Sequence, residues 1–249
     1  MADLSGADSV KSFLAQMLDE AAEKNGSTGV VSPGAVRGTV VALALGALLG
    51  ALSTARASAP QSAGPTALDA THPVSYFIAA GSERTGFRPS DRQLALWAIE
   101  AWRRSASNTL RFEPAAESDA IVRLYWAERS EGQFGEMQPL AIGGRPGAAV
   151  FIRPDMESFG PDIARRAHGD SLFRDGIVYL TCLHELGHAL GLVHTHDFRD
   201  VMYFFGYGGD IGEFFGRYRA QLHARGDIAT VSGLSAGDVS QLKARYGLK

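Results

Sequence analysis

Apolar residues recur with the spacing of regular secondary structure along the second half of the chain. Short runs that alternate apolar and polar positions, or are rich in β-branched and aromatic residues, predict strands at Pro73–Ala80, Thr109–Phe112, Ile121–Trp126 and Ala148–Arg153. Longer segments with apolar residues three and four positions apart predict helices at Asp91–Ala106, at Gly176–Leu190 and within Leu234–Gly247. The pattern therefore predicts a domain that mixes strands and helices.

Residues at the ends of the predicted helices support these boundaries. Ser90 is a suitable N-cap for the helix that follows it. Ser235 and Asp238 have the spacing of a capping box at the start of the last helix. Between these elements, Pro154–Asp175 is predicted to be irregular. Phe204–Gly233 is expected either to contain an extra helix near Glu213–Arg225 or to be simple surface decoration.

The N-terminal part of the chain has a different character. Residues 1–36 form a polar leader, and an apolar run from Thr39 to Leu52 follows the basic residue Arg37. This run is too short for a comfortable membrane span, which needs about 20 residues. It fits the apolar region of a signal peptide, so 37–59 is predicted to be a signal peptide or a membrane anchor.

Two sequences of the form A-x-A, at 55–57 and 57–59, are candidate cleavage sites. The long polar leader indicates either a later translation start, near Val30 or Val31, or an apolar segment that stays uncleaved. Residues 60–71 are predicted to be a linker, which leaves 72–249 as the compact domain. We therefore expect an extracytoplasmic protein, secreted or anchored, that touches a membrane only through the apolar segment.

Charge and cysteine content exclude one class of function and two kinds of stabilising site. The formal net charge is −3, and lysine and arginine do not cluster along any segment, so we expect no binding to nucleic acid. Cys182 is the only cysteine, which excludes an internal disulfide framework and a zinc site built from cysteines.

The segment LHELGHALGLVH, residues 183–194, concentrates three of the seven histidines within twelve residues. His184 and His188 are four residues apart on a predicted helix, so both imidazoles project from one face and can bind one zinc ion. Glu185 lies about 100° around the helix from His184, which keeps it off the metal but close to a water bound there.

The residues after this helix complete the predicted site. Gly191 can adopt a positive φ and end the helix sharply, so that the chain turns back and His194 reaches the same ion. His196 is an alternative third ligand. Three protein ligands leave a fourth position open, which is typical of a catalytic zinc site rather than a structural one.

The residues His184, Glu185, His188, Gly191 and His194 reproduce the pattern H-E-x-x-H-x-x-G-x-x-H, and the chain therefore resembles the metzincin zinc peptidases. Met202 resembles the methionine of the family's Met-turn. Three flanking segments are similar to elements of the matrixin branch: Ala98–Pro114, Asp119–Trp126 and Leu234–Gly247.

The resemblance implies an α+β fold with a small twisted mixed sheet, an active-site helix and a C-terminal helix. It also implies a zinc-dependent endopeptidase in which Glu185 is the general base and His184, His188 and His194 bind one Zn²⁺. A protein or peptide substrate is expected to lie as an extended strand against Ala148–Arg153.

The chain departs from the matrixins at several positions. Cys182 lies inside the predicted catalytic helix, so latency by a thiolate on zinc is unsupported, and a buried apolar role is favoured. His168-Gly169-Asp170 resembles part of the structural zinc site of matrixins, but partner histidines are lacking. The sequence does not support a calcium site. Phe204 stands where some metzincins have a catalytic tyrosine.

Two other functions remain open at this point. The chain could be a catalytically inactive zinc-binding homologue that acts in protein recognition, although Glu185 is present. An intramembrane zinc peptidase is the other alternative, but its motif would lie within a long apolar span. Here the apolar run from Thr39 to Leu52 is far from the motif.

Overall fold

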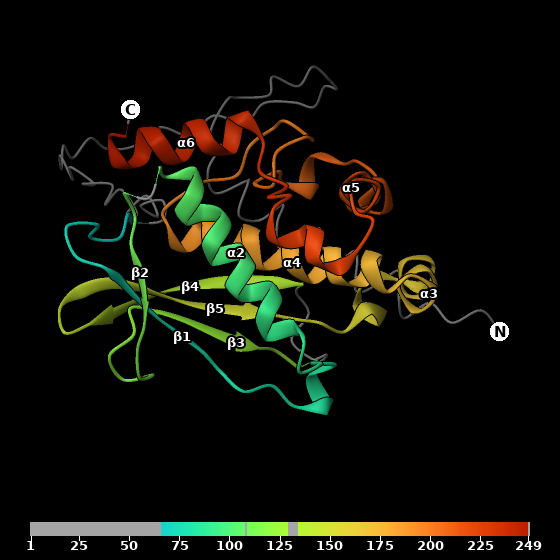
Figure 1. Cartoon of the computed structure of the whole chain (residues 1–249), viewed down its shortest axis with the longest axis horizontal. Coiled ribbons are helices and arrows are strands. Elements are labelled where there is room, and N and C mark those ends of the chain that lie inside the picture. Colours follow the sequence, from blue (N-terminus) through green and yellow to red (C-terminus); the bar gives the residue numbers. More distant parts are fainter. Residues whose placement is uncertain (1–65, 108, 129–133, 249) are drawn as a thin grey trace, which may run out of the picture.

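The computed structural model describes residues 66–107, 109–128 and 134–248, so the predicted leader and the apolar segment lie outside the described residues. Five strands form one mixed sheet in the order β2-β1-β3-β5-β4 (Figure 1). Neighbouring strands are parallel except for β4, which runs antiparallel to β5. The strands are β1 (Val74–Ile78), β2 (Phe112–Pro114), β3 (Val122–Trp126), β4 (Gly135–Ile142) and β5 (Arg145–Ile152).

Two long helices, α2 (Asp91–Ser105) and α4 (Ser171–Ala189), pack side by side against the sheet (Figure 1). Helices α3 (Pro161–Gly169) and α5 (Ile211–Arg219) pack against α4. The C-terminal helix α6 (Ala236–Tyr246) reaches the residues that follow α4. The predicted α+β fold with a mixed sheet is thus confirmed. None of the helices in the described ranges is both long enough and apolar enough to cross a membrane.

The core between α2, α4 and the sheet connects directly to the predicted site. Ile99 and Trp102 of α2 meet side chains of α4, β2 and β3 around one small interior space, whose lining is Ile99, Trp102, Phe112, Val122, Leu186, Ala189 and Leu190. The indole N–H of Trp102 also donates to the carbonyl of Leu183, at 2.9 Å. That carbonyl belongs to the residue before His184, so packing of α2 fixes the part of α4 that carries the motif.

Three of the four predicted strands form close to their expected bounds. In β3, Val122, Leu124 and Trp126 are buried and the residues between them are half-buried, as the alternation predicted. The predicted strand at Thr109–Phe112 is displaced, because the N–H of Thr109 donates to the carbonyl of Ala106 in the turn after α2. Strand pairing begins only at Phe112, opposite Val74.

Strand β4 is missing from the four strands that the sequence predicted. Its residues include Pro139, which cannot donate to a sheet and is normally confined to edge strands. Among the described strands β4 is indeed an edge, joined to β5 through Gly143 and Gly144, both at positive φ. Because β3 and β4 occupy both edges of β5, the prediction that a peptide pairs with Ala148–Arg153 is wrong.

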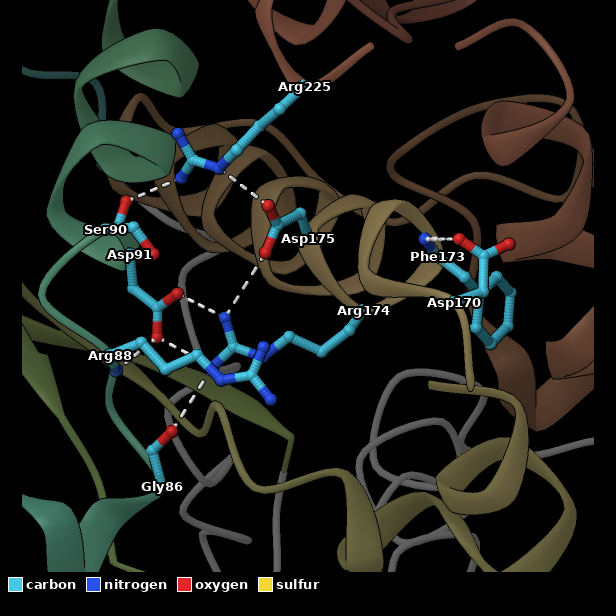
Figure 2. Close-up of polar contacts among 9 residues, drawn as sticks. All are labelled: Gly86, Arg88, Ser90, Asp91, Asp170, Phe173, Arg174, Asp175 and Arg225. Carbon is cyan, nitrogen blue, oxygen red and sulfur yellow. Dashed lines mark hydrogen bonds and ion pairs between the residues drawn. The ribbon is translucent and has the colours of Figure 1, made fainter. Parts of the chain in front are cut away.

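The prediction of an irregular segment at Pro154–Asp175 is also wrong. This segment contains the short helical turn η3 (Met156–Phe159), helix α3 and the first turn of α4. Pro161 starts α3 at a position where its missing N–H costs nothing, and the Asp170 carboxylate caps α4 by accepting from the N–H of Phe173 (Figure 2). The Ser90 side chain, in contrast, makes no capping hydrogen bond to α2.

The first described residues pack against the domain. Leu68 belongs to the buried core, and its N–H donates to the hydroxyl of Tyr246 in α6, at 3.3 Å. Asp69, next to it, pairs with Arg145 at the start of β5. The packed domain of the described chain therefore includes residues that precede His72.

A buried charge network joins the N-terminal ends of α2 and α4 (Figure 2). The guanidinium of Arg174, which is 1% exposed, pairs with Asp91 through both of its terminal nitrogens and also donates to the Gly86 carbonyl. Asp175 links it to Arg225 of the turn η5 (Arg225–Ala229), and Arg225 in turn donates to the Ser90 carbonyl. These bonds fix the orientation of α4 about its own axis relative to α2.

We predict that Asp91→Ala lowers the free energy of unfolding by about 3–5 kcal/mol, because it leaves the Arg174 charge buried without its main partner. Urea unfolding measures the loss. The matched control is Asp162→Ala, which removes an exposed partner of Arg165 from the first turn of α3 and should have little effect. Equal losses in the two variants would contradict a special contribution of the buried pair.

Candidate metal centre

Helix α4 ends where Gly191 adopts a φ of +84°. A Cβ at this position would also lie 3.0 Å from the backbone of Ala67, so both conformation and space favour glycine. The N–H of Gly191 donates to the carbonyl of His188, and the chain then reverses direction. The reversal brings His194 back toward the last two turns of α4, as predicted.

The three imidazoles of His184, His188 and His194 gather around one point. The Nε2 atom of His188 lies 3.1 Å from the Nε2 atoms of both His184 and His194. Two nitrogens on a tetrahedral zinc ion are about 3.3 Å apart, given zinc–nitrogen bonds of about 2.0–2.1 Å. The donor set therefore fits one zinc ion. In the described ranges this is the one cluster of three or more histidine, cysteine or acidic side chains arranged to hold a metal.

Backbone carbonyls orient two of these rings. Nδ1 of His184 is 2.7 Å from the carbonyl oxygen of Val201, and Nδ1 of His188 is 3.0 Å from that of Leu192. A carbonyl oxygen can only accept, so each Nδ1 must carry the proton. Each Nε2 then presents a lone pair toward the cluster, which is the tautomer that a metal-binding histidine requires.

Burial favours the same protonation state. It lowers the pKa of His184 below its ordinary value, and the hydrogen bond to Val201 only partly opposes this effect. His184 is therefore neutral and able to act as a ligand near neutral pH. Burial has the opposite effect on the neighbouring thiol: it raises the pKa of Cys182 well above its usual range, as expected for a buried apolar role.

Met202 packs against α4 at Gly187, between the two helical histidines. It is fully buried, and a Cβ on Gly187 would come within 2.4 Å of its sulfur, so the glycine between the two α4 histidines makes room for this methionine. An isolated β-bridge between Thr195 and Tyr203 joins the segment that follows His194 to the segment that contains Met202. The methionine singled out in the sequence is thus packed against the helix that carries His184 and His188.

The carboxylate of Asp238 holds the turn that contains Val201 and Met202. It accepts from the N–H groups of Val201 at 2.9 Å and Met202 at 3.1 Å, as well as from Ser235 at 2.8 Å in the predicted capping box. Burial raises the pKa of Asp238, whereas these three hydrogen bonds lower it. Because the carbonyl of Val201 orients His184, Asp238 supports this histidine indirectly, through the backbone of Val201. The sequence indicated its capping role but not this second one.

Glu185 follows His184 on α4, and its side chain lies against Gly135, the first residue of β4. Its side chain is largely buried, and a Cβ on Gly135 would come within 2.6 Å of its Cγ and Oε1 atoms. The backbone of the edge strand therefore runs directly against this carboxylate. On another side of the cluster, the ring of Phe204 stacks on His194 with centroids 5.0 Å apart, and it offers no hydroxyl group.

Other residues considered in the sequence lie outside the cluster. His196, the alternative third ligand, stacks on the ring of Tyr207 with centroids 3.9 Å apart. His168 is largely exposed and faces Glu157, and Asp170 caps α4 and pairs with Arg219. The His168-Gly169-Asp170 sequence thus contributes to helix ends and surface ion pairs rather than to a metal cluster.

We predict that Asp238→Asn lowers the free energy of unfolding by about 1–3 kcal/mol, because an amide cannot accept from all three N–H groups. Zinc affinity should fall as well, because the Val201 carbonyl loses its support. The matched control is Asp227→Asn, another capping carboxylate that accepts two backbone N–H groups but lies outside the cluster. Competition with a chromogenic chelator measures the affinity, which should be unchanged in this control.

Comparison with known proteins leaves the geometry as the main guide to function. No protein-family model matches the chain, and no curated protein matches it at a significant level. The structure shows a five-stranded mixed sheet covered by helices, and three histidines from α4 and the chain after it that are able to hold one metal ion.

Proposed function

We propose that this protein is a zinc-dependent endopeptidase of the metzincin type, similar to the matrixins. The observation that carries the proposal is the convergence of three imidazoles, in which Nε2 of His188 lies 3.1 Å from Nε2 of both His184 and His194, next to Glu185 on the same helix. The imidazoles come from a helix and the reversed chain after it, as the spacing of the motif requires. We further propose that the segment 37–59 directs the protein out of the cytoplasm. The exported protein is then either secreted or anchored in the membrane by this segment.

The proposed reaction is hydrolysis of a peptide bond. When bound by the three histidines, zinc supplies Lewis acidity that lowers the pKa of water and polarises the scissile carbonyl. Glu185 accepts the proton of the attacking water and passes it to the leaving amine. Burial keeps His184 neutral by lowering its pKa, and the carbonyls of Val201 and Leu192 hold the Nδ1 protons of His184 and His188, so that each Nε2 faces the metal position. Phe204 provides an apolar wall beside His194 and takes no part in proton transfer.

The edge strand β4 supports an extended peptide as the substrate. Within the described sheet β4 is paired only with β5, so its other edge offers backbone N–H and carbonyl groups to an added strand. Gly135, at one end of this strand, lies against Glu185. A peptide that pairs with β4 would therefore run past the carboxylate. This proposal replaces the strand at Ala148–Arg153, whose edges are both occupied.

A catalytically inactive zinc-binding homologue is the alternative. The effect of substituting Glu185 on peptide hydrolysis distinguishes the two functions. We expect Glu185→Ala to retain one zinc per chain and to hydrolyse a quenched peptide library about 10²–10⁴-fold more slowly than the parent protein. Glu213→Ala, an exposed residue of α5, is the control and should be fully active. Unchanged turnover in the Glu185 variant would refute the general base, and an inactive zinc-loaded parent would favour the alternative.

Removal of the metal tests the ligand set. We expect a strong chelator to abolish hydrolysis and added Zn²⁺ to restore it. His194→Ala should bind zinc much more weakly in metal analysis after dialysis, because only two of the three imidazoles remain. His196→Ala should bind as tightly as the parent, since that ring stacks on Tyr207. The reverse order of affinities would assign the third ligand to His196.

A further inference from the structure

Helix α6 contacts the backbone of the chain that follows α4 at three separate places. The hydroxyl of Tyr246 donates to the carbonyl of Leu190, at 3.1 Å. Further along, Asp238 accepts from Val201 and Met202. Between them, the side-chain amide of Gln241 bonds to Val193, the residue immediately before His194. The first two contacts hold the ends of the loop, and the third lies within it.

Gln241 makes both of the hydrogen bonds that one residue's backbone can offer. Its Oε1 accepts from the N–H of Val193 at 2.6 Å, and its Nε2 donates to the carbonyl of Val193 at 3.1 Å. A two-point contact of this kind restricts both peptide units that flank the residue, because each peptide unit is planar.

Each of these two peptide units leads to one histidine of the cluster. The N–H of Val193 shares its peptide unit with the carbonyl of Leu192, which accepts from Nδ1 of His188 at 3.0 Å. The carbonyl of Val193 shares its peptide unit with the N–H of His194, so it sets the direction in which that residue leaves the turn. One amide therefore acts on the orientation of the His188 ring and on the placement of His194.

Packing does not replace this restraint. The side chain of Leu192 is fully buried, but that of Val193 is 47% exposed, so the hydrophobic anchoring of the turn stops just before His194. Two residues earlier, Gly191 has a φ of +84°, which glycine adopts without strain, and it has no side chain that could anchor the turn. Hydrogen bonding to α6 is thus the restraint that acts on Val193 itself.

We propose that Gln241 is a positioning residue of the metal centre, which sets zinc affinity by holding both peptide units of Val193. This inference rests on the metal-binding part of the proposed function and does not depend on catalysis. Gln241 touches neither the ion nor the substrate. It acts through Leu192 on His188 and through Val193 on His194.

Zinc affinity, measured by competition with a chromogenic chelator, tests the proposal without any activity assay. Gln241→Ala should bind Zn²⁺ about tenfold more weakly than the parent, at the lower end of the loss usual for residues that orient metal ligands. Gln241→Glu keeps an acceptor for the N–H of Val193 but places a second carboxylate oxygen against its carbonyl, so its affinity should also fall below that of the parent. Ser240→Ala, at an exposed neighbouring position of α6, is the control and should match the parent.

A second measurement separates positioning from a general loss of stability. Gln241 is only half-buried, and alanine favours helix, so the metal-free variant should melt close to the metal-free parent. The increase in melting temperature on addition of Zn²⁺ should be smaller in the variant, and the Co²⁺ absorption spectrum should change. Equal zinc affinity in Gln241→Ala and in a zinc-binding parent would overturn this proposal alone. A parent that binds no zinc would contradict the proposed function together with it.

Discussion

Hydrogen bonds between helix α6 and the chain after α4 are the constraint on which the metal centre depends. The loop from Leu190 to Met202 contains no helix or strand, and an isolated β-bridge joins Thr195 to Tyr203, the residue after the loop. The shape of this loop is imposed by the side chains of Asp238, Gln241 and Tyr246, which bind its backbone at separate points. A helix that closes the chain in sequence therefore completes a site whose ligands all lie about fifty residues earlier.

The other half of the site is a rigid helix held along its length. At its N-terminal end the buried pair of Arg174 and Asp91 joins α4 to α2, and near the motif the indole of Trp102 binds the carbonyl of Leu183. Beneath the motif, Met202 fills the space that Gly187 leaves open. Because α4 cannot rotate without breaking these contacts, His184, Glu185 and His188 keep fixed directions. This is the preorganisation that a metal site or a catalytic site requires.

Much of this arrangement was predictable, because it depends on local chemistry. The spacing of His184 and His188 places both rings on one helix face, and Gly191 can turn the chain back, so the three-histidine cluster followed from the motif. The capping box at Ser235 and Asp238 was equally local. Errors arose where tertiary contacts overrode local preference. Strand β4 contains Pro139 and forms because it needs only one paired edge, and α3 forms in a segment with few apolar residues because it packs against α4.

The sequence by itself determined the identity of the histidines, their common helix face and the presence of a carboxylate between them. Only the tertiary structure decided which nitrogen each of the two helical histidines offers, because the carbonyls of Val201 and Leu192 that accept from Nδ1 have no side-chain signature. It also decided that β4, and not β5, is the edge strand of the described sheet and that its first residue, Gly135, lies against Glu185. The contacts of Asp238 and Gln241 with the backbone of the loop after α4 were likewise decided only by the tertiary structure. Backbone groups are identical at every residue, so their partners are chosen by packing across the whole domain rather than by the order of residues along the chain.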